Sequence, residues 1–167
     1  MSDTNRRTVL FVCTGNICRS PMAEVIATHR AALLPHPDGG SVADVLEFKS
    51  AGTAAWHVGE PMDPRAAAVL KAAGFDPDHH RAQHAQHASD SLLAEADLLV
   101  ALDRKHAQIL KGRVSHEQII LLRSQDPMSG GRVDVADPYY GDDAAFEECL
   151  KVVTAGVEAL ISNLASS

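Results

Sequence analysis

Cys13 and Arg19 enclose a short loop that is suited to bind a phosphate group and to attack it. The apolar, β-branched run 8–12 before the loop predicts a buried strand, and Ser20 followed by Pro21 predicts the start of a helix. Between a strand and a helix, backbone N–H groups and the helix N-terminus attract anions, and the Arg19 guanidinium can hold two phosphate oxygens. The same positive potential stabilises a thiolate, so we expect Cys13 to act as a nucleophile.

The residues inside this loop are the candidate phosphate ligands: Thr14, Gly15, Asn16, Ile17 and Cys18. Asparagine tolerates positive φ, and the Asn16 amide can tie a strained loop to its neighbours. Cys18 either forms a reversible disulfide with Cys13 that shields it from over-oxidation, or it only packs within the loop. Ser20 donates its hydroxyl to the Cys13 thiolate or caps the helix, and one hydroxyl can serve both roles.

Asp137 is the candidate general acid and base. It lies in the connection 123–142, which we expect to be functional because structureless connections beyond about 12–15 residues are uncommon in compact domains. Pro138 restricts the chain behind Asp137, and Tyr139 and Tyr140 can form aromatic walls around a phenyl ring. Asp137 would protonate the leaving group in a first step and take a proton from water in a second. A turn aspartate is the alternative, because Asp-Pro commonly opens turns.

Cys-x5-Arg-Ser-Pro at residues 13–21, joined to Asp-Pro-Tyr-Tyr at 137–140, closely resembles the low-molecular-weight protein-tyrosine phosphatases of the bacterial type. The resemblance runs from about Val9 to the C-terminal helix and includes Ser-Ala-Gly-Thr at 50–53 with Trp56. It implies hydrolysis of phosphotyrosine in proteins through a cysteinyl-phosphate intermediate. Inorganic phosphate is the expected product inhibitor, and neither a cofactor nor a metal is expected, because Arg19 and the loop amides supply the positive charge.

The resemblance assigns supporting roles to three further residues. In the family the asparagine of the loop is held by a serine and a histidine, and the matching positions here are Ser50 and His80. Trp56 matches an aromatic residue that lines the substrate cleft, although core packing is the alternative for the only tryptophan in the chain.

Two other polar features have alternative explanations. Asp103 follows a predicted strand and is a rival catalytic carboxylate, but it is better explained as the N-cap of a helix over 104–110. His80, His84 and His87 would share one face if their segment were helical, which raises the possibility of a metal site. No acidic or thiol ligand stands beside them in sequence, so an exposed polar loop is favoured.

Four rival functions are weaker. Arsenate reduction on the related fold needs two further cysteines in a mobile segment, and 74–90 contains none. Protein-arginine phosphatases resemble this loop but tend to carry Thr where this chain has Ile17, and an apolar residue favours an aryl phosphate. A phosphate sensor has no use for both a nucleophile and a remote acid. Nucleotide hydrolysis is excluded because the loop lacks Gly-Lys-Ser/Thr.

Length and composition indicate one α/β domain over residues 1–167. The chain is 46% apolar and only 4% aromatic, and its net charge of −7 argues against a nucleic-acid partner. No run is apolar enough to span a membrane, and the polar 1–7 is expected to be flexible. An odd number of cysteines fits a reducing compartment, so the cytoplasm is the expected location; export without a signal cannot be read from the sequence. The protein is also expected to be a monomer.

Strands and helices are expected to alternate. Besides 8–12, strands are expected over 45–50 and over the apolar segments 98–102 and 118–122, and periodic spacing predicts helices. The last helix has the clearest apolar face, and Cys149 lies on it as a core residue. We therefore predict a four-stranded parallel sheet of order 2-1-3-4 with helices on both faces and the phosphate-binding loop after the first strand. The helices are expected over 22–34, 66–73, 104–110 and 146–164.

Overall fold

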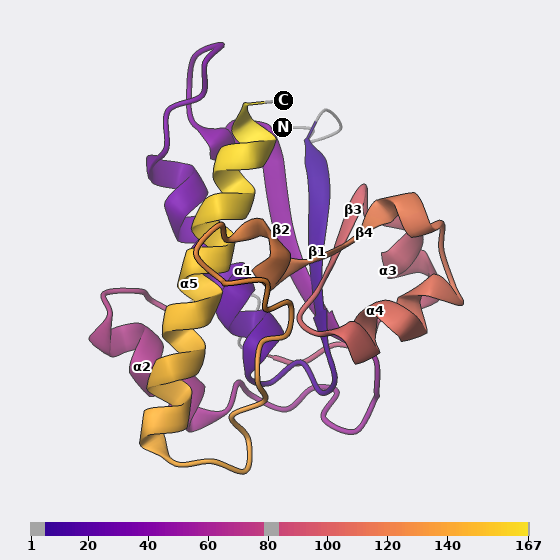
Figure 1. Cartoon of the computed structure of the whole chain (residues 1–167), viewed down its shortest axis with the longest axis vertical. Helices are drawn as coiled ribbons and strands as arrows, with labels where there is room; N and C mark the ends of the chain where they lie inside the picture. The colour runs from indigo at the N-terminus through magenta and orange to yellow at the C-terminus, as the bar shows by residue number, and fades with distance from the viewer. Residues whose placement is uncertain (1–5, 79–83, 167) are drawn as a thin grey trace.

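The predicted alternation of strands and helices is confirmed in the computed structural model, which describes residues 6–78 and 84–166 (Figure 1). The four strands are β1 Arg7–Cys13, β2 Leu46–Gly52, β3 Leu98–Ala101 and β4 Ile119–Leu121. The α-helices are α1 Arg19–Leu33, α2 Pro64–Ala72, α3 Asp90–Glu95, α4 Arg104–Lys111 and α5 Asp143–Ala165. Short 3-10 helices are η1 Val42–Asp44, η3 His116–Gln118 and η4 Leu122–Gln125.

The strands form one parallel sheet in the order β2-β1-β3-β4, as predicted. Successive side chains of β1 point to opposite faces, because the side-chain period of a strand is two. Val9 and Phe11 lie in a core with α1 and α5, whereas Leu10 and Val12 lie in a second core with α3 and α4. Helices therefore cover both faces, with α1, α2 and α5 on one side and α3 and α4 on the other (Figure 1). β1 is consequently central and buried, and it ends at Cys13.

Helices α2, α4 and α5, which flank the candidate site, each have an aspartate at the N-cap. The side chains of Asp63, Asp103 and Asp142 accept hydrogen bonds from the first turns of α2, α4 and α5. α5 buries one face along its length, including Phe146 and Cys149, as the apolar spacing predicted. These caps and the buried face fix where each helix begins relative to the carboxyl edge of the sheet.

The connection 123–142 is fastened to the sheet edge rather than free. The N–H of Val135 donates to Leu102 O over 2.8 Å, and the Arg104 guanidinium pairs with Asp134 at 3.0 Å. Both contacts lie just after β3, at the same edge as Cys13. The connection therefore carries Asp137 toward the loop that follows β1.

Some sequence predictions differ from the structure. The expectation that 1–7 is flexible is wrong for Arg7, which begins β1, and for Arg6, which pairs with Glu47 at 3.2 Å; residues 1–5 lie outside the described part. Helix α3 was not predicted, because its six residues bury only Leu93 and show no periodicity. Among the described residues, no helix is long and apolar enough to cross a membrane.

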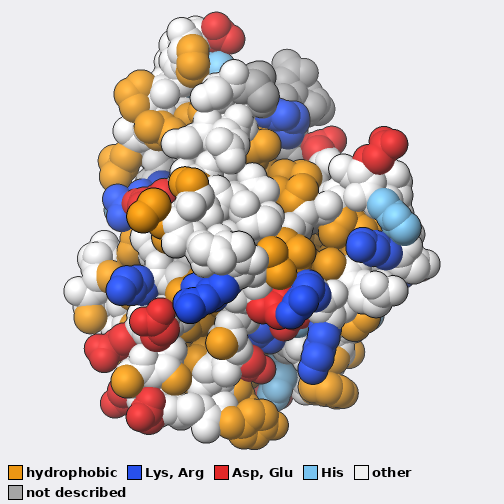
Figure 2. Space-filling view, viewed as in Figure 1, with side chains coloured by type: hydrophobic (Ala, Val, Ile, Leu, Met, Phe, Trp, Pro, Cys, Tyr) orange, Lys and Arg blue, Asp and Glu red, His pale blue; other side chains and the backbone are white. Residues whose placement is uncertain are grey.

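Surface charge is uneven on the face shown in Figure 2. Acidic side chains gather at the lower left, over α2 and the beginning of α5, and Lys and Arg side chains lie across the middle. The net charge of −7 therefore does not describe every part of the surface.

Candidate active site

The loop between β1 and α1 turns its carbonyl oxygens outward. The oxygens of Cys13, Thr14 and Ile17 accept hydrogen bonds from the backbone N–H groups of Thr53, Ala54 and Asp63 at 2.8–3.0 Å. Within the described part of the chain, no hydrogen bond uses the backbone N–H groups of residues 14–18. These N–H groups, followed by the N-terminus of α1, can therefore bind an anion inside the loop.

Asn16 supports the loop from within, as the sequence predicted. It adopts φ 59°, the left-handed conformation that asparagine tolerates better than most residues. Its Nδ2 donates to Ser20 Oγ at 2.8 Å and to Ser50 Oγ at 2.9 Å, and its Oδ1 accepts from the N–H of Gln86 at 2.8 Å. Ser50 in turn donates to the buried Glu24 over 2.7 Å. The predicted serine contact is confirmed, and His80 lies outside the described residues.

Ser20 contacts the candidate nucleophile directly. The Cys13 Sγ and Ser20 Oγ lie 2.9 Å apart, and both side chains are buried. α1 begins at Arg19 with Cys18 at its N-cap, so the alternative that Ser20 caps the helix is wrong. Because Asn16 donates to Ser20 Oγ, the Ser20 hydroxyl hydrogen can point to a Cys13 thiolate and stabilise it.

Arg19 is held at the far side of the loop, with 4% of its side chain exposed. Its Nη1 donates to Asp103 Oδ2 and to Val135 O, each at 2.9 Å. Burial alone would lower the pKa of Arg19, but the charges of Cys13, Asp137 and Asp103 outweigh burial and raise it. The guanidinium is therefore a fixed positive charge beside the Cys13 sulfur.

Asp103 has two roles where the sequence predicted one. It caps α4, since its Oδ1 accepts from the N–H of His106 at 3.0 Å, and its other oxygen holds Arg19. Burial would raise the pKa of Asp103, but hydrogen bonds and charges from His106 and Arg19 keep it below its ordinary value. Asp103 therefore stays ionised, which does not suit a proton donor at neutral pH.

Asp137 faces Arg19 across the pocket, with its Oδ2 3.6 Å from Arg19 Nη2. Its Oδ1 accepts from the N–H of Tyr139 at 3.1 Å, so the predicted alternative of a turn aspartate also holds. The two roles are compatible because a carboxylate has two oxygens. Its side chain is 46% exposed, so solvent reaches the carboxyl group.

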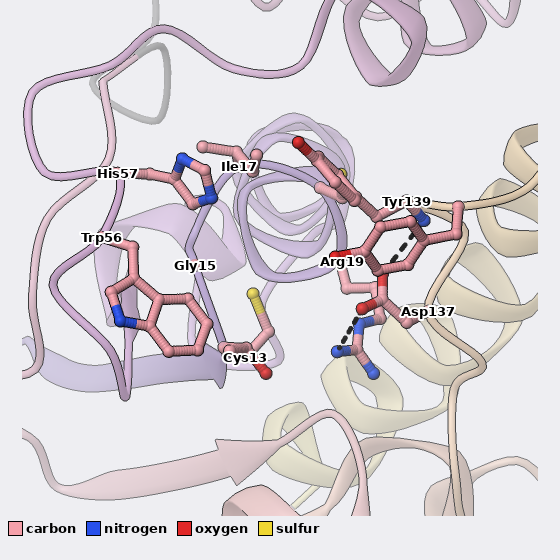
Figure 3. Close-up of a pocket in the computed structure, with 11 residues that line it drawn as sticks. Cys13, Gly15, Ile17, Arg19, Trp56, His57, Asp137 and Tyr139 are labelled. Atoms are coloured by element: carbon pink, nitrogen blue, oxygen red, sulfur yellow. Dashed lines mark hydrogen bonds and ion pairs between the residues drawn. The ribbon is translucent and has the colours of Figure 1, made fainter.

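Aromatic side chains surround the entrance of a pocket of about 170 Å³. Figure 3 shows Cys13 Sγ pointing into the space between Trp56 and His57 on one side and Tyr139 and Asp137 on the other. Trp56 is 74% exposed, so the alternative that it packs in the core is wrong. All of the loop residues predicted to bind phosphate line this pocket except Asn16, which supports it from behind. The pocket is lined by Cys13, Thr14, Gly15, Ile17, Cys18, Arg19, Trp56, His57, Asp137, Tyr139 and Tyr140.

Comparison with known proteins agrees with this geometry. Residues 8–167 match the sequence profile of the family described as low molecular weight phosphotyrosine protein phosphatase. The chain belongs to this family. It is 48% identical to the low molecular weight protein-tyrosine phosphatase A of Mycobacterium tuberculosis strain H37Rv, over 91% of this chain and 88% of that protein.

Solved structures share the fold of this family member. The crystal structure of YfkJ from Bacillus subtilis has a TM-score of 0.83 at 30% identity, covering 96% of both chains. A mutant of the YwlE arginine phosphatase, also a Bacillus subtilis protein, carries a phosphorylated active-site serine. It has a TM-score of 0.78 at 24% identity, covering 94% of this chain and 95% of that chain. The predicted family and fold are thus confirmed.

The other two cysteines of this phosphatase family member are buried thiols. Burial, with nearby negative groups, raises the pKa of Cys18 far above its ordinary value. Burial likewise raises the pKa of Cys149 to about 12, and Cys149 lies in the core as predicted. Cys13 and Cys18 are both free, so a disulfide between them remains a prediction.

Sequence reasoning missed His57 and Arg65. His57 lies against Gly15 so closely that a Cβ on Gly15 would be 2.7 Å from the imidazole. Arg65 pairs with Asp63 at 2.9 Å and donates to the carbonyl oxygens of Tyr139 and Gly141 at 3.0 and 3.3 Å. Arg65 therefore ties the segment that carries Asp137 to α2. The only sequence signals were their positions, next to Trp56 and after the α2 cap.

The metal hypothesis required the histidines of this segment to share one face of a helix. The described histidines, His84 and His87, do not lie in a helix. His84 and His87 lie in extended bridges with Pro61 and Gly52 rather than on one helix face. His79 and His80 lie outside the described residues. Within 6–78 and 84–166, no group of three or more His, Cys, Asp or Glu side chains is placed to hold a metal.

Proposed function

We propose that this chain hydrolyses phosphotyrosine in proteins, with Cys13 as nucleophile, Arg19 as the phosphate-binding group and Asp137 as general acid and base. The observation that carries the proposal is that these three side chains line one pocket with aromatic walls. Cys13 Sγ is 2.9 Å from Ser20 Oγ, and Asp137 Oδ2 is 3.6 Å from Arg19 Nη2. A nucleophile, a cation and an acid are the groups that phosphoryl transfer to sulfur requires.

In the first step, the Cys13 thiolate forms an S–P bond as the bond between phosphorus and the tyrosine oxygen breaks. Asp137 gives its proton to the departing phenolate, so neutral tyrosine leaves. The loop N–H groups and Arg19 stabilise the negative charge on the three equatorial oxygens of the phosphoryl group in the transition state. The phenyl ring lies between Trp56 and Tyr139.

In the second step, water attacks the cysteinyl phosphate and Asp137 takes one of its protons. The P–S bond breaks, the electron pair returns to Cys13, and inorganic phosphate forms. The Ser20 hydroxyl stabilises the departing thiolate. The same N–H groups and Arg19 would hold the product, so we expect inorganic phosphate to inhibit competitively.

Hydrolysis of phosphoarginine in proteins is the second candidate function, because the fold is shared with the YwlE arginine phosphatase. Ile17 favours the first candidate, since its apolar side chain lines the pocket and suits an aryl ring better than a guanidinium.

Three peptides of one sequence, carrying phosphotyrosine, phosphoarginine or phosphoserine, separate these functions through the rate of phosphate release. We expect phosphotyrosine to be hydrolysed fastest, with kcat/KM about 10²-fold or more above phosphoserine. The short serine stem cannot bring its phosphate to the floor of the pocket while the peptide stays outside. Faster release from phosphoarginine would replace the proposal by the second candidate, and equal rates for all three would contradict both.

Replacing Arg65 by Met is expected to lower kcat/KM for phenyl phosphate by about tenfold, because the segment bearing Asp137 loses its tie to α2. The loss should be smaller for p-nitrophenyl phosphate, whose leaving group does not need protonation. Arg113→Met is the matched control. Arg113 also binds a carbonyl oxygen and an aspartate, Ala88 and Asp90, but on the α3 side of the sheet. Equal losses for Arg65→Met and Arg113→Met would contradict a role in positioning Asp137.

A further inference from the structure

His106 contacts the phosphate loop from behind, and the proposed reaction does not yet use it. It belongs to α4, and only 2% of it is exposed. Its Nε2 lies 2.9 Å from Oγ1 of Thr14, the residue after the candidate nucleophile, and Thr14 lines the pocket. A buried imidazole that touches a pocket residue can control how that residue is held.

The surroundings of His106 define its protonation state. Burial lowers its pKa to about 4, and Arg19 acts in the same direction, while Asp103, Asp137 and Asp134 oppose them. The imidazole is therefore neutral near pH 7 and carries a proton on one nitrogen. Asp103 Oδ1 is 3.1 Å from Nδ1 but is not aligned for a hydrogen bond with it, so the carboxylate acts on Nδ1 through its negative charge, which favours a proton there. We assign the proton to Nδ1, which makes Nε2 the acceptor and the Thr14 hydroxyl the donor.

Asp103 continues this chain of contacts to the other end of the loop. Its Oδ1 lies against His106, and its Oδ2 accepts from Arg19 Nη1 at 2.9 Å. Thr14, His106, Asp103 and Arg19 thus join the second residue of the loop to its last, and we call these four residues the loop clasp. Asp103 and His106 lie at the N-cap and in the first turn of α4, which packs on the sheet. The clasp is therefore anchored on a rigid element.

We propose that His106 is a positioning residue: through Thr14 and Asp103 it holds the phosphate loop and the Arg19 guanidinium in one fixed arrangement. The proposal rests on the proposed phosphatase reaction. Stabilisation of charge on the equatorial oxygens requires donors fixed in advance to within about 0.5 Å. A loop that is free to shift at Thr14 loses more in the transition state than in ground-state phosphate binding.

The test compares His106→Leu, Thr14→Val and the double variant, using p-nitrophenyl phosphate and vanadate. Each single variant is expected to lose between about 10-fold and 100-fold in kcat/KM. Affinity for vanadate, which resembles the five-coordinate transition state, should fall by a similar factor, and affinity for inorganic phosphate by less. Because both substitutions break the same contact, the double variant should lose no more than the larger single loss. His106→Gln keeps an acceptor for the Thr14 hydroxyl and should recover most of the activity.

Leu110→Ala is the control for a defect of α4 that is only structural. Leu110 is a fully buried α4 side chain in the second core, so its truncation should lower Tm with little change in kcat/KM. Equal kinetic losses in Leu110→Ala and His106→Leu, or additive losses in the double variant, would overturn the proposal. If His106→Leu does not fold, Thr14→Val still decides, because it removes the hydroxyl without altering α4. If wild type does not hydrolyse aryl phosphates, the proposed function fails, while the vanadate affinities still test the clasp.

Thermal unfolding tests the neutral imidazole separately. An unfolded histidine takes up its proton below about pH 6.5, whereas folded His106 takes it up near pH 4. The unfolded state thus binds more protons in this window, and stability falls as pH drops through it. The Tm of wild type should fall more between about pH 7 and about pH 4.5 than that of His106→Gln. Parallel curves would show that folded His106 takes up its proton at the same pH as an unfolded histidine, which would contradict the buried, neutral imidazole on which the assigned contact with Thr14 rests.

Discussion

Cys13→Ser is expected to abolish turnover of aryl phosphates, with a fall in kcat on the order of 10⁴-fold or more. A serine hydroxyl at this position is not ionised at neutral pH and cannot replace the thiolate as nucleophile. The surrounding donors are unchanged, because the loop N–H groups and Arg19 do not depend on the sulfur. Affinity for inorganic phosphate, measured by calorimetry, should therefore stay within about threefold of wild type.

Cys149→Ala is the matched control for the loss of a buried cysteine. Its thiol packs in the core under α5, and burial raises its pKa to about 12, so it is a neutral packing group at pH 7. Its kcat should stay within about twofold of wild type, with a lower Tm from the lost volume. Substantial turnover by Cys13→Ser would remove Cys13 from its proposed role. The same holds if Cys149→Ala loses activity while Cys13→Ser keeps it.

The part of the site that the sequence predicted is the part built from neighbouring residues. The segment from Cys13 to Arg19 follows a strand and precedes a helix, and such a connection has few conformations, so the loop and the role of Asn16 could be anticipated. Ser20 shows the limit of local signals. The helix begins two residues earlier than a Ser20 cap would require, with Cys18 at the N-cap, and this leaves the Ser20 hydroxyl for the cysteine.

Contacts between distant segments could not be predicted in the same way. The strand order places the residues after β1 and β3 side by side, so Asp103 meets Arg19 and His106 meets Thr14. Nothing in the spacing of a helix cap shows that its second oxygen binds an arginine from another element. The long connection and the Asp-Pro pair left a turn aspartate as an alternative for Asp137, and the resemblance of Asp-Pro-Tyr-Tyr to the family favoured the acid; Arg65 lacked such a signal.

Asp137→Asn is expected to lower kcat/KM for phenyl phosphate by about 10²–10⁴-fold. The loss for p-nitrophenyl phosphate should be at most about tenfold, because nitrophenolate leaves without a proton. The ratio kcat/KM isolates the first step, since departure of the phenol is the first irreversible event. With the second substrate, loss of the base should also slow hydrolysis of the cysteinyl phosphate. A burst of nitrophenol in stopped-flow measurements should then precede a slower steady rate.

Asparagine is the informative replacement because Asp137 also holds a turn. The amide oxygen of asparagine can still accept from the N–H of Tyr139, so the turn is kept and only the exchangeable proton is lost. The same connection offers a matched control in Asp126, which precedes a proline and accepts from the N–H of Met128 at 2.9 Å. Asp126→Asn should change neither substrate's kcat/KM by more than about twofold. Equal losses for the two substrates in Asp137→Asn would indicate that the residue only shapes the pocket, and the proton donor would then have to be sought elsewhere.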